Sequence, residues 1–497
     1  PSVSKNLSES SKIAPSVSEK FSESSKIAPS VSEKLSDRKT IMEDVSLKSD
    51  FQDKINKSFF ARNTKLIIIG VIATGLLFFI GIITLIILYF ALKPAIMTHY
   101  YIKGKSFYNK GKYDMAVLYC DKSLTASYAP SITIKAKSLY FQGKYGDALK
   151  ECDRAIKIDE NYGNAWNTKG EILENRGNYE QAMACYEKAI ETDHDCADAL
   201  YNKGTLLLAK GYNKGKDYVD KAIGLYNKGR GFDRADIHSW NKLGDALYLR
   251  KKYERAIKCY DESLNINGEY ADTWHSKGQI LYYQKKDKDA EDCFNKALIY
   301  YDKELEIYPL SGILWNQKGN VFYLKEKYKD AIKCYDKALE MLPDNPIIWA
   351  NKAYAFYERK YYSEALKYFR KALEVNSSYV EALVMKGNIF REQKKYSDSL
   401  DCYEKAIEIN PDYATGWAGK GDVYYDREKY EKAIDCYNKS IALNPDDPLV
   451  WNSKGVCLYS IGEYKEAIEC YEKSLEINPD DEVVRQNKDN ALKALGK

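Results

Sequence analysis

The stretch Ala165-Trp166-Asn167-Thr168-Lys169-Gly170, followed by Tyr179-Glu180-Gln181-Ala182, decides how this chain folds, because close variants of it recur along most of the sequence. The same pattern returns at Trp417-Ala418-Gly419-Lys420-Gly421 and at Tyr430-Glu431-Lys432-Ala433. Residues 97–481 contain about eleven copies, with a period of about 34 residues. A period of that size predicts a solenoid of stacked helical or mixed units.

Each copy is predicted to hold two helices. We number every unit so that its recurring small residue, Gly or Ala, is position eight. Because no large residue occurs at this position, we expect another helix to pass close to it. Trp315, Gly319 and Phe322 lie three and four residues apart, which places them on one helix face, and the second half of that unit repeats the spacing. All seven tryptophans fall on position four, which indicates a periodic core: Trp166, Trp240, Trp274, Trp315, Trp349, Trp417 and Trp451.

These signatures resemble the tetratricopeptide repeat, with Trp at position four, Gly at eight and Ala at twenty. The resemblance implies an all-α fold, a right-handed α-α superhelix in which two antiparallel helices per unit stack around a concave inner face. It covers residues 97–481. Residues 482–497, with Ala491, Leu492 and Leu495 on one face, are expected to form a capping helix.

The resemblance also implies that partners bind to the inner face of the first helices, at positions two, five, six, nine, twelve and thirteen. Asn amides both donate and accept hydrogen bonds, which suits the backbone of an extended peptide. Alternatively, Asn is a tolerated polar residue on a wet helix face, and the tyrosines at position twelve pack between units. The candidate groove residues are Asn167, Asn202, Asn241, Asp245, His275, Gln279, Asn316, Asn320, Asn351, Asn388, Asp422 and Asn452.

One known binding mode of the family is disfavoured. Members that clamp a chaperone's C-terminal carboxylate use Asn at positions matched here by Asn320 and Asn351, but the third unit offers Glu381 and Met385 in place of basic residues. A chaperone-tail receptor is therefore not expected.

Position seven is Lys in every unit except that of Leu243. We expect the lysine stems to pack while the ammonium groups reach water. The alternative is a basic stripe that contributes to binding.

Two units are longer than the others. The extra residues of the fourth unit, 197–236, are expected between its helices around Gly211–Lys216, and those of the sixth, 271–311, are expected to continue its second helix. In that extension the apolar residues keep a helical spacing: Leu298, Tyr301, Leu305 and Tyr308. Such insertions mark a binding face or are neutral elaborations.

The N-terminal part differs in character. Leu66 to Leu92 contains no charged residue and exceeds the roughly 20 residues that span a bilayer, so a single transmembrane helix is predicted at 66–92, ended by Pro94. Residues 1–65 are Ser-rich, with three tandem copies at 1–14, 15–28 and 29–42 (together 1–42), and are expected to be disordered.

The cysteines are the basis for predicting the membrane orientation. Lys and Arg are balanced on the two sides of the apolar segment, so the positive-inside rule does not decide. Most of the 11 cysteines occupy one place in successive units, too far apart to pair, and are expected to be buried free thiols. Free thiols favour a reducing compartment, which predicts cytoplasmic repeats.

The sequence does not indicate an enzyme. The four histidines form no metal-binding motif, and His238 and His275 are expected at the surface or rim. Gly211–Lys216 lacks the spacing of a phosphate-binding loop. The formal net charge is +4 but the distal repeats are acidic, which disfavours nucleic acid. No cofactor, metal or small-molecule substrate is predicted.

The sequence therefore predicts a single-pass membrane protein whose repeats bind other proteins or extended peptides as a scaffold. One alternative is a receptor or accessory subunit of a protein translocation or assembly machine. Another is a non-catalytic targeting subunit of an enzyme such as a glycosyltransferase.

Overall fold

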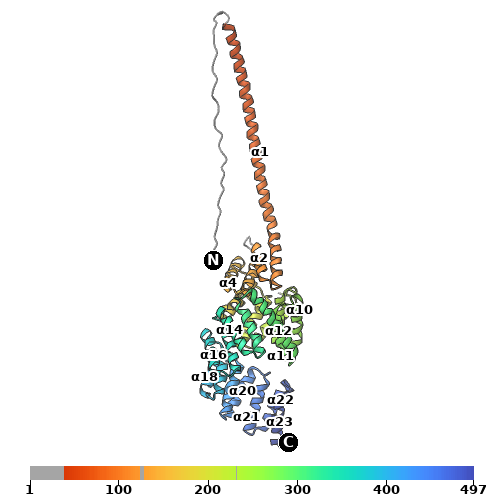
Figure 1. Cartoon of the computed structure of the whole chain (residues 1–497), viewed down its shortest axis with the longest axis vertical. Helices are drawn as coiled ribbons and strands as arrows, with labels where there is room; N and C mark the ends of the chain where they lie inside the picture. The colour runs from red at the N-terminus through yellow and green to blue at the C-terminus, as the bar shows by residue number, and fades with distance from the viewer. Residues whose placement is uncertain (1–37, 124–127, 231, 497) are drawn as a thin grey trace, which may run out of the picture. The chain divides into compact units, whose positions relative to one another are not determined.

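The computed structural model describes residues 38–123, 128–230 and 232–496, and every regular element in those ranges is an α-helix (Figure 1). The chain divides into two compact units, one ending at Phe90 and the other spanning Ala91–Lys497. In the second unit the helices pair along the sequence and each pair packs on the next. The all-α solenoid that the sequence predicts is therefore confirmed.

The end of α1 (Arg38–Tyr108) forms the first helix of the first repeat, and the first helices of the later repeats follow it along the sequence. They are α3 (Ala129–Phe141), α5 (Gly163–Asn175), α7 (Ala197–Ala209), α9 (Ile237–Leu249), α11 (Ala271–Tyr283), α13 (Gly312–Leu324), α15 (Pro346–Glu358), α17 (Val380–Glu392), α19 (Ala414–Asp426) and α21 (Pro448–Ser460).

The second helices alternate with them. They are α2 (Tyr113–Lys122), α4 (Tyr145–Ile158), α6 (Tyr179–Thr192), α8 (Gly215–Asn227), α10 (Tyr253–Ile266), α12 (Asp287–Ile307), α14 (Tyr328–Met341), α16 (Tyr362–Val375), α18 (Tyr396–Ile409), α20 (Tyr430–Leu443) and α22 (Tyr464–Ile477). The chain's last helix is α23 (Glu482–Ala494), whose Val484 and Ala491 are buried in a cluster with Leu458 and Tyr471.

Helix α1 corrects two expectations. It continues through Pro94 to Tyr108, although Pro94 was predicted to end it. A proline costs one backbone hydrogen bond, but the residues beyond it form the first helix of the first repeat and are held by their own packing, with Tyr108 buried. The helix also begins at Arg38, so residues 38–65 are helical and not disordered; the tandem copies before Arg38 lie outside the described residues.

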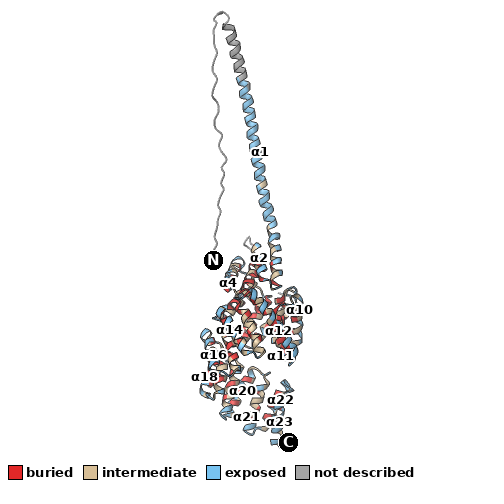
Figure 2. Cartoon of the chain, in the orientation of Figure 1, coloured by how far each residue is buried: buried red, intermediate tan, exposed pale blue. Residues whose placement is uncertain are grey.

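The apolar segment of α1 is exposed along its length, as the pale blue colour in Figure 2 shows. The stretch Asn56–Tyr108 reaches a mean hydropathy of 2.9 and is long and apolar enough to cross a membrane. It is the one such helix among the residues that the structure describes.

In most units the glycine at position eight packs against an aromatic ring of the same unit, whereas Gly104 packs against Cys120 and Gly204 against Val219. A Cβ atom added at Gly170 would lie 2.5 Å from Tyr186 Cε1, and one at Gly319 would lie 2.6 Å from Tyr335 Cε1. Both rings are almost fully buried. The prediction that a second helix passes close to position eight is confirmed.

The tryptophans are only half-buried, and they fix the chain at the start of each unit. All seven indole N–H groups donate to the backbone carbonyl six residues earlier, for example Trp349 Nε1 to Pro343 O at 2.8 Å. Each tryptophan thus satisfies a loop carbonyl and covers the junction between two units.

Seven of the ten lysines at position seven form ion pairs among the described residues, which the sequence did not predict. Lys352 Nζ lies 2.6 Å from Asp336 Oδ1, and Lys277 Nζ lies 2.6 Å from Asp261 Oδ1, each 16 residues earlier on the second helix of the preceding unit. Among the described residues, no ion pair forms at Lys386 or Lys454, where position i−16 is Arg370 or Asn438. The ammonium groups therefore join neighbouring units.

The two long units differ in where their extra residues lie. In the sixth, α12 is lengthened and buries Tyr301, Leu305 and Tyr308, as predicted. In the fourth, the prediction was wrong in its main point: α7 ends at Ala209 and α8 begins at Gly215, so most of the added length lies after α8, in 228–236. Gly204 packs against Val219, 15 residues later, close to the 16 residues that separate Gly170 from Tyr186, so α8 keeps the usual place of a second helix.

Units far apart in sequence also contact each other. The side-chain amide of Asn345 donates to Asn175 O at 2.6 Å, and that of Asn410 donates to Lys210 O at 2.6 Å. Asn267 makes the same contact with Lys110 O at 3.2 Å. Each asparagine satisfies a carbonyl at the end of a first helix four or five units earlier, so successive turns of the superhelix are in contact.

These contacts explain the glycines in the turns of the early units. Gly143, Gly177 and Gly211 have positive φ, and a Cβ atom at each would collide with a later unit, at Leu310, Asp344 or Tyr413. From the fifth to the tenth unit the same turn position also has positive φ but is filled by Lys or Glu: Lys251, Lys285, Glu326, Lys360, Lys394 and Glu428. Glycine is thus required by the contact between turns and not by the backbone angle alone.

Candidate functional site

A cavity of ≈ 650 Å³ lies on the inner face of the solenoid, between α9, α11, α13, α15 and α17. Its walls come from the inner-face positions of four consecutive first helices, together with Glu381 of the next. Six of the predicted groove residues line it: Asn241, Asp245, His275, Gln279, Asn320 and Asn351. The other six, Asn167, Asn202, Asn316, Asn388, Asp422 and Asn452, lie outside its lining.

The asparagines at positions five and six bond to each other across neighbouring units. Asn202 Nδ2 donates to Asn167 Oδ1 at 2.9 Å, and Asn351 Nδ2 donates to Asn316 Oδ1 at 3.1 Å. Asn487 of the capping helix makes the same contact with Asn452 at 3.0 Å. These amides set the register between units, an arrangement that neither sequence interpretation included.

The residues at position nine accept hydrogen bonds from tyrosines of the second helices. Tyr260 donates to Asp245 Oδ1 at 2.6 Å, and Tyr335 donates to Asn320 Oδ1 at 3.0 Å. The same relation joins Tyr403 to Asn388 at 2.5 Å and Tyr437 to Asp422 at 2.8 Å. A buried hydroxyl therefore holds each inner-face side chain in one orientation.

Tyrosines at position twelve reach the next unit, and Tyr323 also lines the cavity. Its hydroxyl donates to Glu358 at 3.3 Å, and Tyr357 donates to Glu392 at 3.3 Å. Both roles that the sequence left open are therefore found at Tyr323.

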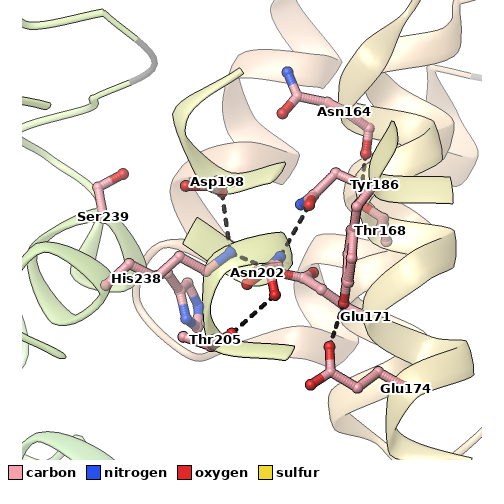
Figure 3. Close-up of polar contacts among 12 residues, drawn as sticks. Asn164, Thr168, Glu171, Glu174, Tyr186, Asp198, Asn202, Thr205, His238 and Ser239 are labelled. Atoms are coloured by element: carbon pink, nitrogen blue, oxygen red, sulfur yellow. Dashed lines mark hydrogen bonds and ion pairs between the residues drawn. The ribbon is translucent and has the colours of Figure 1, made fainter. Parts of the chain in front are cut away.

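A second polar cluster joins the third, fourth and fifth units (Figure 3). Lys242 Nζ lies 2.5 Å from Glu171 Oε1 and 3.1 Å from Asp198 Oδ2, and Asn202 Nδ2 donates to the same Glu171 oxygen at 2.9 Å. Tyr226 completes the cluster with a 2.6 Å bond to Asp198. Of these residues only Asn202 was predicted as a groove residue, because carboxylates are common along the helices and none stands apart from the repeat pattern.

The cluster holds one cation between two carboxylates. Burial alone would favour neutral groups, but Lys242 overrides it and lowers the pKa of Asp198 to about 2. In the same way the two carboxylates overcome the burial of Lys242 and raise its pKa above the usual value. Lys242 likewise outweighs the burial of Glu171 and lowers its pKa, so all three groups are charged at neutral pH.

The carboxylates around the cavity lack such a cation. Burial raises the pKa of Asp245 to about 6 and that of Glu304 to about 8, the latter also because Asp272 lies nearby. Asp272 accepts from Tyr301 at 2.5 Å, and Glu381 accepts from Tyr354 at 2.7 Å. Among the described residues, none of these four carboxylates forms an ion pair with a lysine, arginine or histidine.

His275 is buried, which corrects the expectation that it lies at the surface or rim, whereas His238 is half-buried. His275 is 9% exposed, and His238 stacks against the rings of Tyr108 and Phe141 at centroid distances of 4.6 and 5.1 Å. Burial lowers the pKa of both imidazoles to about 4, so both are neutral at physiological pH. In the described part of the chain no three His, Cys, Asp or Glu side chains are grouped to hold a metal ion.

Comparison with solved structures gives similar but distant arrangements. The crystal structure of yeast Tom70 is 16% identical, with a TM-score of 0.47 over 81% of this chain and 96% of that one. The crystal structure of the APC/C hetero-tetramer Cut9-Hcn1 is 14% identical, with a TM-score of 0.38 over 80% and 96% of the two chains. None of the curated protein sequences matches the chain.

Family models match through most of the solenoid. Tetratricopeptide repeat models match residues 163–196, 233–303, 347–379 and 448–481, and a TPR repeat model matches 319–359, 387–425 and 421–462. Together these matches cover more than half of the chain. The chain therefore belongs to the tetratricopeptide repeat family.

Proposed function

We propose that this protein is a membrane-anchored scaffold whose repeats hold partner proteins or extended peptides at the inner face. The observation that carries the proposal is the cavity of ≈ 650 Å³, which lies on the inner face and presents oriented polar and aromatic side chains. A cavity of this size accommodates several side chains of a partner. The role is non-enzymatic.

The anchor is the apolar segment of α1. Its large hydrophobic residues are exposed, for example Phe78 and Leu85, and water does not stably solvate an apolar helix of this length. A lipid bilayer covers such a surface. Resistance of the full chain to alkaline extraction of membranes supports the anchor, and release into the soluble fraction contradicts it.

We further propose that the repeats face the cytoplasm. All eleven cysteines are free and buried, which suits a reducing compartment. Because the native thiols are shielded, one exposed cysteine at Lys214→Cys reports the orientation to a membrane-impermeant maleimide. We expect labelling only after cell lysis. Labelling in intact cells would place the repeats outside.

Partner binding is tested with a photo-cross-linking amino acid at Gln279, which lines the cavity, and at exposed Glu476 on α22 as the matched control. Protein adducts that form at Gln279 and not at Glu476 support a scaffold that uses the inner face. Equal adducts at both sites contradict it. Adducts mainly with unfolded precursors would favour a translocation receptor over a static scaffold.

A further inference from the structure

The cavity carries unbalanced negative charge. Asp245, Asp272 and Glu381 line it, and Lys242, the lysine in the same wall, is already committed to Glu171 and Asp198. Carboxylates that are removed from water without a cation are costly. A bound cation would remove that cost.

Each of these carboxylates is held in place. Tyr260 and Tyr301 donate to one oxygen of Asp245 and Asp272, at 2.6 and 2.5 Å. Glu381 accepts from Tyr354 on one oxygen at 2.7 Å and from Tyr379 on the other at 3.3 Å. These hydrogen bonds fix the planes of the carboxylates, and each carboxylate keeps lone pairs that can accept from a ligand. The three groups come from α9, α11 and α17, so they reach the cavity from different sides.

His275 is a second and independent indication of a ligand. Its side chain lines the cavity, is nine-tenths buried, and makes no hydrogen bond to any described residue. Its ring nitrogens are not among the enclosed atoms of the described residues that lack a partner, so they face the open space of the cavity. A donor group within the cavity would bind to one of them.

The walls between these polar groups are aromatic. Tyr270, Tyr283 and Tyr323 line the cavity beside Phe141. Aromatic faces attract cations and pack against the planar guanidinium group. The volume of ≈ 650 Å³ is far larger than a metal ion and fits an organic group.

We propose that this cavity binds an organic cation, a guanidinium or ammonium group, between the carboxylates of Asp245, Asp272 and Glu381. This inference rests on the proposed function and gives the partner's chemistry: an extended segment that inserts a basic side chain. A free small amine presents the same chemistry, and the experiment separates the two sources.

The test uses the full chain in detergent micelles and a fluorescein-labelled Gly/Ser heptapeptide with one central arginine. Its control has citrulline, a neutral group of nearly the same shape, in place of arginine. We expect the arginine peptide to bind at least tenfold more tightly, and N-methylguanidine to compete with it. If only N-methylguanidine binds, a free amine is the source. If neither the arginine peptide nor N-methylguanidine binds more tightly than the citrulline peptide, the proposal is overturned.

Asp272→Asn is expected to reduce the preference for arginine at least tenfold. The amide oxygen of the new side chain can still accept from Tyr301, so the fold is retained. Glu476→Gln, on the exposed face of α22, serves as the charge-matched control and should change nothing. An unchanged preference in Asp272→Asn overturns the proposal.

Gln279→Lys provides a test whose first readout, the melting temperature, needs no probe. The new ammonium group would enter the cavity, so this variant should melt at a higher temperature than Gln279→Met. It should also lose binding of the arginine peptide. A lower melting temperature than that of Gln279→Met contradicts a cation site. If protein adducts form at Gln279 in the unsubstituted protein while the arginine peptide does not bind to that protein, the scaffold stands and only the cation inference fails.

Discussion

Asn345 and Asn175 are 170 positions apart in the sequence, yet the side-chain amide of Asn345 donates to the backbone carbonyl of Asn175 at 2.6 Å. The same asparagine caps α15, because its Oδ1 accepts from the backbone N–H of Ile347 at 2.9 Å. One side chain thus starts a helix and joins two turns of the superhelix.

Asn345→Asp should separate these two tasks. A carboxylate still caps α15 but no longer donates, and it faces the Asn175 carbonyl with like polarity, so the free energy of unfolding should fall by about 1–3 kcal/mol. The control is Asp447→Asn, at the equivalent position of the tenth unit, where Asp447 caps α21. That exchange should be nearly neutral in urea denaturation; an equal loss in both variants would mean that the contact between turns contributes nothing.

Gly177→Ala should destabilise the protein by about 2–4 kcal/mol, because it adds both a left-handed backbone penalty and a collision with Asp344. Lys394, at the equivalent turn position of the ninth unit, already has a φ of 58°. Lys394→Gly should therefore raise stability, by up to about 1 kcal/mol. Thermal melting followed by circular dichroism distinguishes the two, and opposite signs are required.

Lys352→Met should lower stability by about 1 kcal/mol or more, because the side chain of Lys352 is only 9% exposed and pairs with Asp336. Lys386 occupies the same position in its unit, but the residue 16 positions before it is Arg370, which is also positively charged. Lys386→Met should therefore be neutral or slightly stabilising. Similar losses for both lysines in chemical denaturation would show that packing of the stem, and not the ion pair, is responsible.

Lys242→Met removes the only cation of the cluster with Glu171 and Asp198, whose side chains are 20% and 19% exposed. Two carboxylates are then left close together, and we expect a loss of about 2–4 kcal/mol. Adding Glu171→Gln should recover part of that loss, since one of the two negative charges disappears. A double variant as unstable as the single one would contradict this account.

Glu304 should make stability fall as the pH rises. Its folded pKa, about 8, lies above the unfolded value near 4.3, so the folded state holds the proton more tightly and its contribution is complete below pH 4 and lost between about pH 4 and pH 8. Glu304→Gln should remove this slope and stabilise the protein at pH 8, by on the order of 2 kcal/mol. Melting temperatures measured from pH 5 to pH 8 test this; parallel curves for the two proteins would contradict it.

The sequence predicted what depends on neighbours within one unit. The helix pairs, the close approach at Gly170 and Gly319, the buried cysteines and the lengthened α12 all follow from a period of one repeat. It could not predict contacts such as Asn410 to Lys210, because these depend on how many units make one turn. That number is set by small rotations between units, which no single residue records.

The candidate site was predicted in part for the same reason. Six of the twelve proposed residues line the cavity, and the other six lie outside its lining. Asp272 and Glu381, at position two, were missed as a set because Asn was taken as the signal for binding. Inspection of position two in every unit would have found both carboxylates.

The pairing of position seven with an acid of the preceding unit bears on how the chain can lengthen. Each copy except that of Leu243 carries a lysine at position seven and, in most units, an acid for the unit after it, as Lys420 with Glu404 shows; Lys488 of the capping helix pairs with Glu472 in the same way. A duplicated gene segment that encodes one whole repeat therefore brings both halves of the junction and leaves no unmatched charge at either boundary. The lengthened α12 forms the same kind of ion pair, because its added residues place Asp302 next to Lys318 of the following unit.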